Sequence, residues 1–227
     1  MGSRHDVTTA GIRLAYEVSG APAAAPMVLL HALGEGRASW AEVGPQFAER
    51  FRVYALDLRG HGDSDWPGIY SAELIRDDVI GALDQLGLDR ITLVGHSMGG
   101  TAAYLVAMAQ PDRLERLIIE DVPFPFRRDR PVPERPEQAL DFDWEVVPAF
   151  FGQVNEVDPA AWDRLSTITA PTLLIGGGPD SHIPADQLEA VAARIPRCEL
   201  VTIPAGHHVH VGRPAEFASV VLSWLAP

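Results

Sequence analysis

Short apolar runs rich in β-branched residues alternate with amphipathic stretches along most of this chain. The expected strands are 12–18, 26–31, 52–57, 91–95, 116–121, 172–176 and 199–204. The expected helices are 38–49, 71–86, 97–109, 184–195 and 214–225. Such alternation predicts an α/β fold, a mostly parallel central sheet with helices on both faces. Because residues 12–18 alternate between apolar and polar, we expect them to form an antiparallel strand at the sheet edge.

Size and charge narrow the class of protein. A chain of 227 residues suits one α/β domain, so we expect a single domain spanning residues 1–227. The formal net charge of −13 argues against DNA, RNA or an anionic membrane as the main partner. The single cysteine, Cys198, excludes an intrachain disulfide. Without a signal peptide or an apolar run near the roughly 18 residues of a membrane span, we expect a soluble, cytoplasmic protein.

Residues 122–168, called here the cap segment, interrupt the alternation. The segment is rich in proline and contains no clear strand. Its aromatic residues are Phe124, Phe126, Phe142, Trp144, Phe150, Phe151 and Trp162. Because it follows the carboxyl end of a strand, where α/β folds bind ligands, we expect a short lid over a cleft. The pocket would include Phe124, Phe126, Trp144 and Phe150. The alternative is a surface insertion with its own small core.

The run Gly95-His96-Ser97-Met98-Gly99 matches the pattern G-x-S-x-G. It follows an expected strand and opens an expected helix, the context in which such a serine sits exposed on a sharp, strained turn. Glycines two residues to either side let neighbouring backbone approach closely. This context favours a nucleophilic Ser97 over the alternative, a serine that merely caps the helix.

Together with Ser97, four further segments make the chain resemble the α/β-hydrolase-fold serine hydrolases. Residues 29–40 resemble the family's oxyanion loop, and residues 57–65 resemble its strand-and-turn signature. Residues 171–184 resemble its acid-bearing turn, and residues 203–217 resemble its histidine-bearing loop. The resemblance covers nearly the whole chain. It implies the α/β-hydrolase fold, with a short cap after the sixth strand, and hydrolysis through a covalent serine intermediate.

The resemblance implies a catalytic triad of Ser97, Asp180 and His207. A serine hydroxyl needs an adjacent base, and histidine has a suitable pKa. An anionic partner then fixes the tautomer of that histidine. Asp180 lies just past an expected strand, and Asp121, which ends the preceding one, is the alternative.

The backbone N–H groups of Met98 and Leu33 are the implied oxyanion hole. The chain has His31-Ala32 where the family usually has His-Gly, and alanine adopts fewer backbone conformations than glycine. We expect His31 and His61 to satisfy backbone hydrogen bonds.

The remaining histidines around the expected site are predicted to be structural. His96 belongs to the sharp turn, and His208 and His210 flank the loop of His207. The run "HHVH" at 207–210 could indicate a metal, but no carboxylate accompanies it in sequence, so no metal site is expected.

We therefore expect a serine hydrolase that cleaves a carboxylic ester, thioester or lactone of a small, apolar molecule, without cofactor or metal. Three alternatives remain open. One is a C–C bond hydrolase of dienoate-type substrates, one a cofactor-free perhydrolase or haloperoxidase, and one a non-catalytic ligand-binding receptor. For the serine hydrolase, the C–C bond hydrolase and the perhydrolase or haloperoxidase, the expected partner is a small-molecule substrate. No sequence feature indicates an oligomeric state.

Overall fold

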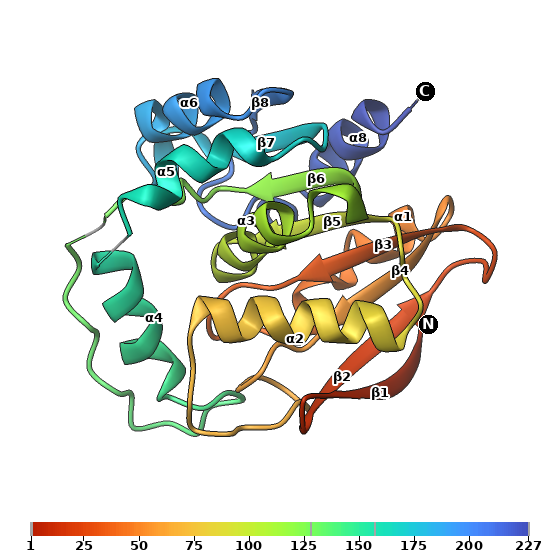
Figure 1. Ribbon diagram of the computed structural model, residues 1–227, viewed down its shortest axis with the longest axis horizontal. Coiled ribbons are helices and arrows are strands. Elements are labelled where there is room, and N and C mark those ends of the chain that lie inside the picture. Colours follow the sequence, from red (N-terminus) through yellow and green to blue (C-terminus); the bar gives the residue numbers. More distant parts are fainter. Residues whose placement is uncertain (1, 128, 157, 227) are drawn as a thin grey trace.

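A sheet of eight strands runs through the computed structural model, which describes residues 2–127, 129–156 and 158–226 (Figure 1). The strand order is β1-β2-β4-β3-β5-β6-β7-β8. The strands are β1 (Ser3–Thr9), β2 (Ile12–Ser19), β3 (Ala25–Leu30), β4 (Phe51–Leu56), β5 (Ile91–His96), β6 (Leu114–Glu120), β7 (Thr172–Gly176) and β8 (Cys198–Thr202). From β3 to β8 all neighbours pair in parallel, which confirms the expected mostly parallel sheet.

The strand β1 was not expected, and its presence corrects one prediction. β2 pairs with both β1 and β4, antiparallel in each case, so residues 12–18 do not form the edge of the sheet. Only Val7 and Thr9 of β1 are buried, so this strand has no apolar pattern that would reveal it. An exposed strand of this kind depends on its partner for its hydrogen bonds.

Helices cover both faces of the sheet (Figure 1). The α-helices are α1 (Gly44–Phe47), α2 (Ala72–Gln85), α3 (Met98–Ala109), α4 (Val146–Asn155), α5 (Ala160–Arg164), α6 (Ala185–Arg194), α7 (Val209–Gly212) and α8 (Pro214–Trp224). The short 3-10 helices are η1 (Arg37–Ala41), η2 (Pro111–Arg113), η3 (Leu165–Thr167) and η4 (Gly178–Asp180). One apolar core includes side chains of α2, α3 and α6, and the other includes side chains of η1, α1 and α8.

The expected helix at 38–49 is divided into η1 and α1. Pro45 lies in the first turn of α1, where a missing backbone N–H costs nothing, so it starts a new helix instead of continuing the previous one. The other expected helices agree with α2, α3, α6 and α8.

The cap segment contains α4, α5 and η3, while Arg128 and Val157 within it lie outside the described residues. Figure 1 shows α4 beyond the carboxyl ends of the parallel strands. Two hydrogen bonds fix α4 and the residues just before it near the start of α2. The Tyr70 hydroxyl donates to Asp143 at 2.7 Å, and the Ala72 N–H donates to the Gln153 side chain at 2.6 Å. In the described part of the chain, no helix has the length and apolar character needed to cross a bilayer.

Candidate active site

Ser97 occupies the turn between β5 and α3 in a backbone conformation that is unfavourable for a residue with a side chain. Its φ is 50° and its ψ is −113°. Such a conformation costs of order 1–3 kcal/mol and persists only where the surrounding structure enforces it. The Ser97 side chain makes no capping hydrogen bond to α3, so the alternative of a helix-capping serine does not hold.

The glycines around Ser97 are required by close backbone contacts. A Cβ on Gly95 would lie 2.5 Å from the Gly99 carbonyl oxygen, and a Cβ on Gly99 would lie 2.6 Å from the His31 carbonyl oxygen. The Gly99 N–H donates to that same His31 oxygen at 3.1 Å. The turn is therefore packed directly against the loop that follows β3.

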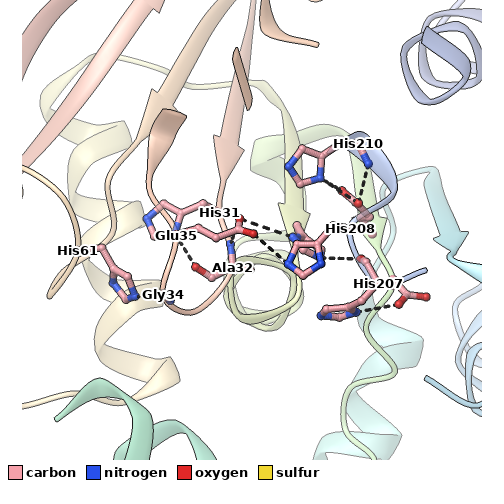
Figure 2. Close-up of polar contacts among 11 residues, drawn as sticks. His31, Ala32, Gly34, Glu35, His61, His207, His208 and His210 are labelled. Atoms are coloured by element: carbon pink, nitrogen blue, oxygen red, sulfur yellow. Dashed lines mark hydrogen bonds and ion pairs between the residues drawn. The ribbon is translucent and has the colours of Figure 1, made fainter. Parts of the chain in front are cut away.

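His207 lies in the loop after β8, and its Nδ1 is 2.8 Å from the Asp121 carboxylate (Figure 2). Asp121 is completely buried directly after β6, with a φ of 51°. Its carboxylate also accepts hydrogen bonds from the Gly177 N–H at 2.7 Å and from the Ser181 hydroxyl. All three donors come from loops at the carboxyl ends of β7 and β8, so Asp121 joins these loops to β6.

The expected pairing of His207 with Asp180 is wrong in this structure. Asp180 ends η4 with an exposed side chain, and among the described residues the partner of His207 is Asp121, the alternative. The Asp180 backbone lies near Gly206, so the aspartate is close in space but its carboxyl group remains in solvent. The sequence does contain a signal for Asp121. This residue directly follows β6, Ser97 directly follows β5, and the two strands are neighbours that end at the same edge of the sheet.

The surroundings of His207 favour its neutral form. Burial lowers the pKa of His207, the hydrogen bond to Asp121 opposes this, and the net shift is downward. The rings of His182 and His96 lie with centroids 4.2 Å and 4.8 Å from the ring of His207. A neutral imidazole whose Nδ1 donates to a carboxylate has a lone pair on Nε2 and can act as a base. Among the described residues no hydrogen bond joins His207 to the Ser97 hydroxyl, and such bonds often tighten only with substrate.

The loop after β3 provides the setting that the implied oxyanion hole needs. Met98 is the first residue of α3, so its N–H has no partner within the helix. Leu33 lies two residues before Glu35 in a loop that is fixed by histidines. His31 accepts from the Leu58 N–H at 2.9 Å. His61 accepts from the Gly34 N–H at 3.1 Å, and Figure 2 shows these two residues side by side.

Both of these histidines bond to backbone, as expected from the sequence. Burial lowers the pKa of His31 to about 4 and that of His61 to about 3. The substitution of glycine by Ala32 creates no strain, because the positive φ in this loop belongs to Gly34, at 78°.

A cavity of about 150 Å³ opens beside Ser97 under the cap segment. Phe124, Phe126 and Phe150 line it, as expected. Trp144 is not among its lining residues in the described chain and lies instead beside Phe142, with ring centroids 6.4 Å apart. Phe142 stacks on His61, and a Cβ on Gly34 would lie 3.4 Å from the Phe142 ring, so Phe142 packs against the loop after β3.

The model of the α/β hydrolase fold family matches residues 25–162. This span is more than half of the chain, and the chain belongs to the α/β hydrolase fold family. With that family it shares the eight-stranded, mostly parallel sheet described above, and the protein is an enzyme of the hydrolase class.

Curated relatives are similar over nearly their full length. A putative 2-succinyl-6-hydroxy-2,4-cyclohexadiene-1-carboxylate synthase of Bacillus subtilis is 28% identical over 99% of this chain and 99% of its own. The sn-1-specific diacylglycerol lipase ABHD11 of Mus musculus is 28% identical over 94% of this chain and 85% of its own. The 2-hydroxymuconate semialdehyde hydrolase of a Pseudomonas species is 28% identical over 97% and 93%.

Solved structures of other proteins are also similar to this chain over nearly their full length. An esterase of Thermogutta terrifontis matches with a TM-score of 0.84 and 28% identity, over 98% of both chains. Est816, described as an N-acyl homoserine lactone degrading enzyme, matches with a TM-score of 0.83 and 27% identity, over 97% of this chain and 100% of its own.

The packing at the turn generates a stability prediction. Gly99→Ala should lower the free energy of unfolding by about 1–3 kcal/mol, because its new methyl group would meet backbone that cannot rotate away. Gly44→Ala is the control, since a Cβ there meets no atom within 4 Å, and its stability should equal or slightly exceed that of the wild type. Urea denaturation of both variants measures the difference, and equal stability of Gly99→Ala and wild type would contradict the packing argument.

Proposed function

We propose that this enzyme is a serine hydrolase that cleaves a carboxylic ester, thioester or lactone through an acyl-Ser97 intermediate. The observation that carries the proposal is the pairing of buried Asp121 with His207 near a strained Ser97. Two residues with positive φ lie at the ends of adjacent parallel strands, and strain of this kind clusters at functional sites. The family membership and the esterase and lactonase relatives support the same class of reaction.

In the first half-reaction, the Ser97 hydroxyl attacks the substrate carbonyl carbon while His207 Nε2 takes the hydroxyl proton. Negative charge then develops on the carbonyl oxygen, and the N–H groups of Met98 and Leu33 stabilise it. Collapse of this tetrahedral intermediate breaks the bond to the alcohol or thiol. His207 returns the proton to that leaving group, and the acyl group remains on Ser97.

In the second half-reaction, water repeats the attack on the acyl-Ser97 ester. His207 takes the proton of the water, and the Ser97 oxygen leaves with that proton restored. Asp121 stabilises the imidazolium that forms in each half-reaction. The carboxylic acid product and the free enzyme balance the reaction, with no cofactor required.

The cavity indicates a small acyl group. Its volume of about 150 Å³ lies below the roughly 300–1,000 Å³ of sites for drug-sized ligands. The phenylalanines Phe124, Phe126 and Phe150 favour an apolar group near Ser97. Arg164, Glu73 and Asp158 also line the cavity and would meet polar parts of a substrate.

A C–C bond hydrolase is the second candidate, favoured by the similarity to the 2-hydroxymuconate semialdehyde hydrolase. It would use the same serine, base and acid on a carbon leaving group. A panel of esters, lactones and dienoate-type substrates distinguishes the two candidates.

A fluorophosphonate probe tests the nucleophile. The wild-type enzyme should gain the mass of one phosphonyl group, as Ser97 displaces fluoride, and should hydrolyse p-nitrophenyl butyrate. Ser97→Ala should gain no mass and lose at least about 1,000-fold in kcat/KM. Ser223→Ala, at an exposed serine of α8, is the matched control and should behave as wild type. A folded wild-type enzyme that gains no mass would overturn the proposal and favour a ligand-binding receptor.

Paired substitutions test which carboxylate orients His207. Asp121→Asn should lower kcat on p-nitrophenyl butyrate by about 10³–10⁴-fold, because the amide cannot hold the same imidazole tautomer. Asp180→Asn should leave kcat unchanged, since its carboxyl group is exposed. The reverse pattern, with Asp180→Asn inactive and Asp121→Asn active, would assign the role to Asp180.

A further inference from the structure

A second cluster of ionisable side chains gathers around His96, the residue before Ser97. Its other members are Glu35, Glu120, His208 and His210. They come from the loop after β3, the end of β6 and the segment after β8, and Figure 2 shows Glu35, His208 and His210 near the loop of His207. The carboxylate that the "HHVH" run lacks in sequence is thus supplied from more distant segments.

Hydrogen bonds fix the tautomers of two buried rings in this cluster. His210 Nδ1 lies 2.9 Å and 2.8 Å from the two carboxylate oxygens of Glu120. His96 Nε2 lies 2.9 Å from the His207 carbonyl oxygen. Since carboxylate and carbonyl oxygens only accept, the nitrogens facing them carry the protons. When the rings are neutral, the lone pairs therefore lie on His210 Nε2 and His96 Nδ1.

Both of these nitrogens are buried, and neither has a hydrogen-bond partner in the described part of the chain. His96 Nδ1 lies 3.9 Å from a carboxylate oxygen of Glu35. One ligand atom each from His210, His96 and Glu35 lies within 4.8 Å of the other two. Acceptors this close together repel one another unless a positive charge lies between them.

We propose that Glu35, His96 and His210 form a binding site for a divalent transition-metal cation of the zinc type. Two imidazoles and one carboxylate are a ligand set that zinc takes in proteins, with water at the fourth position. Glu120 behind His210 makes the carboxylate–histidine pair that typically orients a zinc ligand. The charge of the ion balances the two carboxylates, Glu35 and Glu120.

The site is rigid on one side and adjustable on the other. His210 is fixed by Glu120 and by stacking on Trp40, with ring centroids 4.1 Å apart. Glu35 is partly exposed and lies 3.1 Å from His208 Nε2, so its side chain is less tightly packed than the two buried histidines. Tetrahedral zinc with bonds of about 2.0–2.2 Å separates its ligand atoms by roughly 3.3 Å. The three ligand atoms, now within 4.8 Å of one another, would therefore move together by up to about 1.5 Å when the ion binds.

A proton is the rival occupant. Burial lowers the pKa of His96, but the charges of Glu120 and Glu35 outweigh this and raise it. A proton on His96 Nδ1 would need a Glu35 oxygen, now 3.9 Å from that nitrogen, to move closer, and it would still leave His210 Nε2 without a partner among the described residues. A cation uses all three acceptors at once, so the geometry favours the metal.

Titration of Zn²⁺ into chelator-treated full-length protein tests the site. Calorimetry should give one site per chain, and Zn²⁺ should raise the melting temperature. Glu35→Gln should weaken Zn²⁺ binding at least about 10–100-fold, as losses around zinc sites typically do. Because Glu35 is partly exposed, this variant should stay folded, as circular dichroism checks. The controls Glu42→Gln and His5→Gln change exposed residues outside the cluster and should bind Zn²⁺ as wild type does.

Bound Co²⁺, whose visible absorption reports coordination geometry, should give a four-coordinate spectrum in wild type that is lost in Glu35→Gln. Mg²⁺ should not compete, because it prefers oxygen ligands. Ser97→Ala should bind Zn²⁺ normally, so the result is independent of the hydrolase chemistry. Absence of stoichiometric Zn²⁺ binding by folded wild type, or equal binding by Glu35→Gln, would overturn the proposal and assign the cluster to a proton.

Discussion

The buried carboxylate of Asp121 holds together the edge of the sheet on which the candidate active site is built. Its oxygens accept from Gly177, Ser181 and His207, so one side chain ties the loops after β7 and β8 to the end of β6. A buried charge is stable only when such donors surround it. The position of His207 is therefore a consequence of how three loops satisfy one anion.

The same edge carries two strained backbone positions. Ser97 and Asp121 follow adjacent strands, β5 and β6, and both have positive φ. The paired strands on either side cannot relax, and the Gly99 contact with His31 binds the serine turn to the oxyanion loop. The proposed nucleophile, base, acid and oxyanion loop are thus placed by the sheet and by backbone contacts, while the cap segment supplies most of the apolar wall of the cavity.

Local patterns were sufficient to predict most of the fold, but not the partner of His207. Apolar runs predict β2 to β8, and G-x-S-x-G predicts the turn at Ser97, because both depend on neighbouring residues. Polar β1 has no such pattern. Asp121 and Asp180 both follow a strand, and contacts across 56 to 86 residues of sequence decide which carboxylate is buried.

The same limit applies to the second cluster and to the cap segment. His210 meets Glu120 across 90 residues of sequence, and no local motif announces that meeting. Trp144 was expected in the cavity because it is aromatic and lies in the cap segment. Trp144 instead lies beside Phe142, which stacks on His61, and only the folded chain defines these contacts.

¹⁵N NMR of histidine-labelled protein measures directly whether Asp121 fixes the tautomer of His207. We expect the His207 proton to lie on Nδ1 in wild type and in Asp180→Asn, and we expect Asp121→Asn to abolish this preference. A His207 ring protonated on Nε2 in wild type, or one unaffected by Asp121→Asn, would show that Asp121 does not set the tautomer.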